Sequence, residues 1–202
     1  MQGVRWFGDF LGDGWIRMRI PNLPEGPTRM KPDNDKPFPP YAFVPGGPWP
    51  HPTRTPEGHS YGRSVGKTDP IVGDDWARSA PYRRGVTLFN AGYYWEAHEA
   101  WEALWHAHGR QGPTADVLKG LIKLAAAGVK VRERQPHGIL THARRAAALF
   151  EEARARAGAR LLGLDLEGLI VKARRIADAP PGDPEPPGAR VSRVFPFLIE
   201  PA

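Results

Sequence analysis

The chain of 202 residues contains no cysteine. Without a thiol it can form no disulfide, no thiolate metal site and no cysteine nucleophile. It also has no apolar run long enough to span a bilayer, and its N-terminus lacks the basic-then-apolar pattern of a secretory signal. We therefore expect a soluble, cytoplasmic protein that does not act in a membrane.

Several short motifs are missing as well. The sequence has no glycine-rich phosphate loop, no serine nucleophile elbow and no dinucleotide fingerprint. It also lacks the interleaved aromatic and basic strand pattern of folds that bind single-stranded nucleic acid. The protein classes that depend on these motifs are excluded. Whether the chain is an enzyme stays open.

Proline is scarce only in the middle of the chain. Of the 23 prolines, 13 lie in residues 1–79, 3 in residues 80–179 and 7 in residues 180–202. Because an internal proline costs a helix about 3 kcal/mol, helices must concentrate in the middle region. We predict a Pro/Gly-rich extended arm over residues 1–79, an all-helical domain over 80–179 and a proline-rich extension over 180–202.

The arm carries aromatic residues that a free tail would not need. Its proline-rich part favours polyproline-like extended chain, with Tyr41, Phe43 and Trp49 as apolar contacts to the domain. Residues 15–20 alternate in period two and predict one short strand. The alternative is a proline-rich tail that binds a partner.

Helical periodicity and end signals divide residues 80–179 into about five helices, so the predicted fold is an all-α bundle of packed helical hairpins. The helices are expected over about Pro81–Asn90, Tyr93–His108, Thr114–Arg134, Ile139–Ala157 and Asp165–Asp178, with Ser79, Thr114 and Asp165 as N-caps. The predicted core contains Trp101, Leu104, Trp105, Leu121, Ile122 and Leu149. The final "RVFPFLIE" predicts a short extended segment.

The second predicted helix holds an unusual density of polar and aromatic side chains. Residues 89–110 contain three histidines, three glutamates and three tryptophans. Beside the core face runs a stripe with His98, Glu99, Glu102 and His106, in which neighbours four residues apart can meet. Since an unpaired buried polar group costs about 1–3 kcal/mol, this stripe predicts an internal polar network or a small-ligand pocket.

His98 and Glu102 are also candidate ligands for a divalent metal ion. The stretch "HEAWE" is similar to the zinc-protease pattern His-Glu-x-x-His, with Glu102 in place of the second histidine and Glu99 as the candidate base. A third ligand must come from elsewhere in the fold. A metal-dependent hydrolase is therefore an alternative to the internal network. A di-iron bundle needs Glu-x-x-His motifs, and this chain has none.

Positive charge is concentrated in the helical region. Residues 80–179 hold 16 basic and 10 acidic side chains, a difference that accounts for the net charge of +6. Lys119 and Lys123 on the third predicted helix can face Glu99 and Glu102, and there they would close the network or orient a charged ligand. The excess favours an anionic small molecule or an acidic protein, with RNA as a less favoured partner; the alternative is a solvated basic face.

Two stretches resemble the signatures of the family called domain of unknown function 309. They are "LFNAGYYWEAHEAWEALW" (88–105), which includes Asn90 as a further site candidate, and "LKGLIKLAAAGVK" (118–130). The resemblance covers about residues 82–178 and implies a compact all-helical domain, without an activity or a cofactor. The family usually has glutamine where this chain has Lys119 and Lys123. Gly92, Tyr94, Ala97 and Trp101 are also spaced as in tetratricopeptide repeats, which implies stacked helical hairpins.

Overall fold

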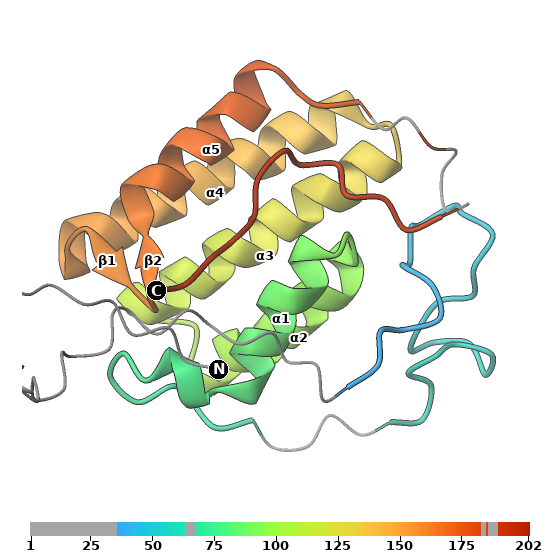
Figure 1. The fold of residues 1–202 in the computed structure, drawn as a ribbon, viewed down its shortest axis with the longest axis horizontal. Coiled ribbons are helices and arrows are strands. Elements are labelled where there is room, and N and C mark those ends of the chain that lie inside the picture. The colour runs from blue at the N-terminus through green and yellow to red at the C-terminus, as the bar shows by residue number, and fades with distance from the viewer. Residues whose placement is uncertain (1–35, 64–67, 183–184, 186–189) are drawn as a thin grey trace, which may run out of the picture.

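A computed structural model describes residues 36–63, 68–182, 185 and 190–202 of the chain. The predicted all-α fold is confirmed: helices pack against one another, and the single sheet found in the described residues has two very short strands (Figure 1). The elements in order are η1 (Trp76–Arg78), α1 (Ala80–Asn90), α2 (Tyr94–Ala107), α3 (Pro113–Arg132), α4 (Pro136–Ala157), β1 (Arg160–Leu161), β2 (Leu164–Asp165) and α5 (Leu166–Asp178). The strand predicted over residues 15–20 lies outside the described residues.

Two of the predicted helix starts are confirmed. Ser79 is the N-cap of α1, and its hydroxyl oxygen accepts a hydrogen bond from the Tyr82 backbone N–H at 3.4 Å. Asp165 occupies the N-cap position of α5, although its side chain makes no capping hydrogen bond there. A short polar side chain at this position can satisfy a backbone N–H that has no partner inside the helix.

Two other predicted starts are wrong by a few residues. α3 begins at Pro113 after the N-cap Gly112, so Thr114 lies inside its first turn, and α4 begins at Pro136 instead of near Ile139. Proline fits the first turn of a helix because the N–H that it lacks would have no intrahelical acceptor there. The predicted starts at Thr114 and Ile139 are therefore one and three residues too late.

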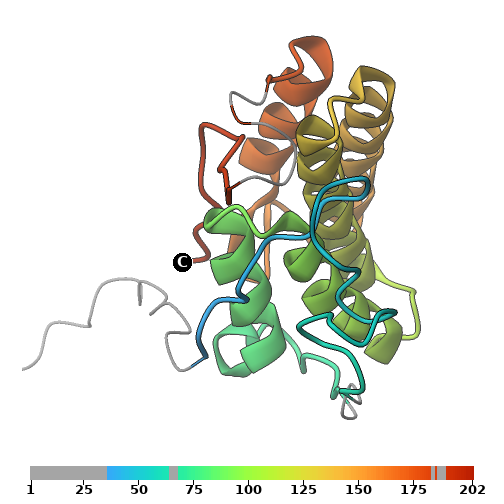
Figure 2. The same cartoon turned by 90° about the vertical axis from the view of Figure 1, so that its right-hand side faces the viewer.

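Each α-helix packs against the next one along the chain, and α3 contacts both α2 and α4. Figures 1 and 2 show α3, α4 and α5 side by side, with α1 and α2 against them. Five of the six predicted core residues are buried, namely Trp101, Leu104, Leu121, Ile122 and Leu149. None of the described helices combines the length and the apolar sequence that crossing a bilayer requires.

Trp105 is the exception among the predicted core residues, because it is only partly buried. The Lys119 ammonium lies 3.6 Å from the centroid of its ring, and the Arg110 guanidinium lies 5.1 Å from it. Cations stack favourably on the face of an indole ring. Trp105 therefore lies at the edge of the core, where the side chains of Lys119 and Arg110 cover it.

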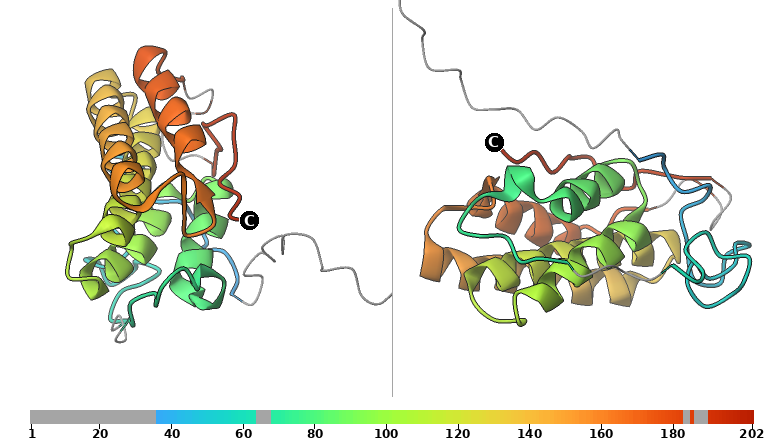
Figure 3. Two further views of the ribbon diagram at one scale, coloured as in Figure 1. Left: turned by 90° about the vertical axis from the view of Figure 1, so that its left-hand side faces the viewer. Right: turned by 90° about the horizontal axis from the view of Figure 1, so that it is seen from below.

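Residues 36–63 form bends and turns rather than one continuous extended stretch, and they lie at one end of the helices (Figures 1 and 3). Tyr41 and Phe43 are buried, while Trp49 is 41% exposed and stacks on Tyr41 with ring centroids 5.2 Å apart. Phe43 meets Trp95 of α2 edge to face at 5.0 Å. Aromatic contacts of this kind attach the segment to α2.

The C-terminal residues 190–202 run without regular secondary structure between the α1–α2 pair and α5 (Figure 1). Phe195 stacks on Phe89 of α1 with centroids 5.7 Å apart, and the backbone N–H of Val194 donates to the Tyr94 hydroxyl at 3.0 Å. This segment therefore contributes to the same core as the helices.

Candidate functional site

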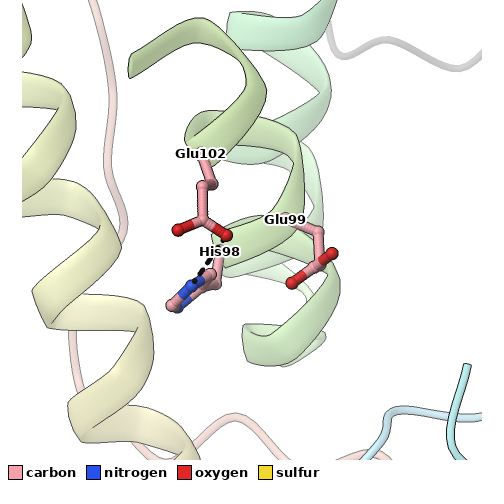
Figure 4. Close-up of side chains that lie close together, drawn as sticks. All are labelled: His98, Glu99 and Glu102. Carbon is pink, nitrogen blue, oxygen red and sulfur yellow. Dashed lines mark ion pairs between the residues drawn. The ribbon is translucent and has the colours of Figure 1, made fainter. Parts of the chain in front are cut away.

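His98, Glu99 and Glu102 form the polar cluster predicted on the second helix. One ligand atom from each residue lies within 4.8 Å of the other two, and His98 Nε2 is 3.6 Å from Glu102 Oε2. Figure 4 shows His98 and Glu102 directed toward each other and Glu99 on the neighbouring side of α2. Spacings of one and four residues on a helix produce this arrangement.

The cluster lies at the border between core and solvent. The His98 side chain is 27% exposed and that of Glu102 is 36% exposed, while Glu99 is an exposed residue. The ring of His98 stacks on Trp95 with an interplanar angle of 9°. Packing thus holds the imidazole in place, whereas the two carboxylates remain accessible to a ligand.

The protein environment shifts the pKa values of Glu99 and His98 in opposite directions. Although Glu99 is exposed, desolvation by the surrounding protein atoms raises the pKa of its carboxyl, the neighbouring Glu102 and Glu96 carboxylates raise it further, and Arg54 opposes the shift. Burial lowers the pKa of His98, although Glu102 opposes the shift. His98 is therefore held in the neutral form that ligates metal ions, and Glu99 lies in a field that would favour a nearby cation.

Lys119 and Lys123 of α3 do not form ion pairs with Glu99 or Glu102 in the part of the chain that the structure describes. Lys119 instead stacks on Trp105. Partial burial, followed by the charge of Lys123, lowers the pKa of Lys119, although Glu102 raises it. The two lysines therefore contribute positive potential beside the cluster rather than direct bonds to it.

The structure does not bring Asn90 and His106 into the cluster. The side-chain amide of Asn90 donates to the Ile199 carbonyl and accepts from the Ile199 N–H, both at 2.8 Å. His106 is exposed, and its Nδ1 lies 2.8 Å from a guanidinium nitrogen of Arg110. Asn90 therefore holds the C-terminal segment on α1, and His106 belongs to the surface around Trp105.

His142 of α4 is a neighbour of the cluster that the sequence did not indicate. Its pKa is lowered to about 4, first by burial and then by the charges of Lys123, Lys130 and His98. Side chains of α2 (His98) and of α3 (Lys123 and Lys130) thus affect the pKa of a histidine of α4. Because His142 is distant in sequence from α2, no local spacing could have predicted this proximity.

We expect His142 to make folding stability sensitive to acid. Its folded-state pKa of about 4 lies below the unfolded value of 6.5, so the unfolded chain takes up a proton first as the pH falls. This contribution to stability is complete above pH 6.5, is lost between pH 6.5 and about 4, and then levels off. Thermal unfolding should show that His142→Gln reduces the drop in Tm between pH 7 and pH 4.5.

His137→Gln is the matched control for this prediction, because His137 is an exposed histidine on the same helix. It should leave the drop in Tm close to that of the unmodified protein. If both variants reduced the drop in Tm between pH 7 and pH 4.5 by the same amount, the result would contradict the assignment of the acid sensitivity to His142.

Glu96 is a second residue that the sequence analysis missed. Its Oε1 accepts a hydrogen bond from the Phe43 backbone N–H at 3.0 Å and lies 3.2 Å from His59 Nε2, while its buried Oε2 has no hydrogen-bond partner among the described residues. On a helical wheel Glu96 lies about 200° from Tyr94, on the side opposite the core. Residues 36–63 bury that side, so a wheel of α2 alone could not show it.

Comparison with known proteins supports the resemblance seen in the sequence. A search among curated proteins found no match. Residues 82–141, which run from α1 into α4, match the family model described as a domain of unknown function (DUF309).

Proposed function

We propose that the protein binds a divalent transition-metal ion through His98, Glu99 and Glu102. The observation that supports this function is the approach of one imidazole nitrogen and two carboxylate groups to within 4.8 Å of one another on α2. Imidazole and carboxylate are ligands that zinc and neighbouring metals accept at about 2.0–2.2 Å. Three such ligands leave at least one coordination position for water.

The geometry requires only a small rearrangement to hold an ion. Ligand atoms around a tetrahedral ion at about 2.0 Å are roughly 3.3 Å from each other. The ligand atoms of the cluster lie within 4.8 Å of one another, so they must approach by at most about 1.5 Å. Both carboxylates are on flexible side chains that solvent reaches, and rotamer changes can supply this movement. A cation would also offset the desolvation and the repulsion from Glu102 and Glu96 that raise the pKa of Glu99.

A bound ion would give this site hydrolytic chemistry. A metal ion lowers the pKa of its bound water to about 7 and so supplies hydroxide at neutral pH. Lys119 and Lys123 place positive charge beside the cluster, which favours an anionic substrate. If Glu102 and His98 alone hold the ion, Glu99 is positioned as the general base. The competing account is an internal network, in which the His98–Glu102 pair only stabilises the fold.

Thermal unfolding after chelation tests the proposal. Zn²⁺ at 100 times its Kd should stabilise the native state by about 2.7 kcal/mol, which corresponds to a Tm increase of roughly 5–10 °C for a chain of this size. Glu99→Gln should abolish the increase. The same substitution should slightly raise the Tm of the metal-free protein at neutral pH, because it removes a carboxylate whose pKa is raised by folding.

His106→Gln is the matched control, since it removes a histidine of α2 that lies outside the cluster. This variant should keep the full metal-dependent increase. If Glu102→Gln lowers the metal-free Tm and no divalent ion shifts the unmodified protein, the internal network is correct and the metal site is not.

A further inference from the structure

A cavity of about 470 Å³ lies between the end of α5 and the C-terminal segment, away from the cluster on α2. One wall is a single face of α5, formed by Lys172, Arg175 and Ile176 at helical spacings of three and four residues, and it continues in Ala179 just beyond the end of the helix. The opposite wall contains Pro196 and Phe197. A volume in this range is typical of sites for small molecules.

The cavity has both an apolar surface and charged side chains in its lining. Ile176, Pro196 and Phe197 provide an apolar surface, and the Lys172 ammonium lies 5.2 Å from the centroid of the Phe197 ring. Arg175 contributes a second cation, and Asp178 is the single acidic residue of the lining. A ligand with an apolar body and one negatively charged group could contact the apolar surface and the two cations at the same time.

The two cations of this cavity have no ion-pair partner among residues 36–63, 68–182, 185 and 190–202. Arg174, which is next to Arg175 in sequence, instead bonds to Glu151 of α4 at 2.8 Å. Arg174 is thus paired with a carboxylate of α4, whereas the two cations of the cavity have no such partner within the described residues. A guanidinium without a carboxylate is ready to form charge-assisted hydrogen bonds with one from a ligand.

We infer that this cavity binds a small carboxylic acid with an apolar chain or ring, its carboxylate held by Lys172 and Arg175 and its apolar part against Ile176 and Phe197. This site is independent of the proposed metal site. Its net charge of one positive unit, from two cations and one carboxylate, suits a monoanion better than a polyphosphate.

Isothermal titration calorimetry with 4-phenylbutyrate tests this inference, and 4-phenyl-1-butanol is the neutral ligand of the same shape. The acid should bind the full-length protein, and the alcohol should bind at least about tenfold more weakly because it cannot form charge-assisted hydrogen bonds. Arg175→Gln should weaken binding of the acid about tenfold, and raising the salt concentration should weaken it as well.

Two further variants separate the cavity from general effects of charge and folding. Arg174→Gln removes one positive charge from the same turn of α5 but not from the cavity, and it should leave the Kd unchanged within about twofold. Ala179→Phe places a ring in the cavity and should prevent binding, while a melting curve checks that the variant is folded. No binding of the acid, equal binding of the alcohol, or equal losses in Arg174→Gln and Arg175→Gln would overturn the inference.

Discussion

Trp101→Ala should destabilise the protein by about 3–5 kcal/mol, because a large buried side chain is replaced by a cavity. Trp101 is fully buried at the contact between α1 and α2. Its ring lies 5.9 Å from that of Phe89, and its indole N–H donates to the Tyr82 carbonyl at 3.3 Å. The fit is close enough that a Cβ atom on Gly85 would come within 2.3 Å of the indole nitrogen.

Urea and thermal unfolding measure this effect. For a chain of this length the loss corresponds to a decrease in Tm of roughly 6–20 °C. Trp49→Ala is the control, because Trp49 is 41% exposed and lies outside the helices; it should cost less than about 1 kcal/mol. Similar small losses in both variants would contradict the assignment of Trp101 to the centre of the core.

Gly128→Ala should cost about 1–3 kcal/mol even though alanine favours helices. A Cβ atom at Gly128 of α3 would lie 2.6 Å from the Tyr94 ring of α2, which is buried and cannot move freely. The Tyr94 hydroxyl accepts the hydrogen bond from Val194, so displacing the ring would also disturb the C-terminal segment. Overpacking a close helix contact has an energetic cost of this size.

Gly138→Ala in the first turns of α4 is the matched control for Gly128→Ala. Its Cβ atom would meet the Lys130 side chain, with Cγ and Cδ at 2.9 Å and Cβ at 3.4 Å, instead of a buried ring. The methylene groups of Lys130 can rotate away more easily than the Tyr94 ring, and the gain in helix propensity of roughly 0.5–1 kcal/mol offsets part of the cost. Denaturant unfolding should therefore show a smaller loss of stability for Gly138→Ala than for Gly128→Ala. Equal changes in both variants would show that α2 and α3 are not in close contact at Gly128.

The helices could be predicted from the sequence because their signals are local. Ser79 and Asp165 precede apolar periodic stretches and occupy the N-cap positions of the helices there. The two errors at the starts of α3 and α4 involve Pro113 and Pro136, which are the first residues of these helices. A proline in the interior of a helix ends or kinks it, whereas a proline in the first turn is accommodated. A proline alone does not distinguish these two situations.

The candidate site could be predicted only to the extent that it lies on one helix. His98, Glu99 and Glu102 are close in sequence, so helical geometry alone groups them. His142 and Glu96 depend on tertiary packing, since α4 brings one to the site and residues 36–63 bury the other. The burial of one side of α2 by a segment without regular structure has no periodic signal in the sequence.

Equilibrium dialysis against Zn²⁺, followed by elemental analysis of the protein, tests the proposed metal site most directly. We expect one tightly bound ion per chain in the unmodified protein and in His106→Gln, and loss of that ion in His98→Gln and Glu102→Gln. Retention of zinc by both of the latter variants, or the absence of zinc from the unmodified protein, would contradict the proposed metal site.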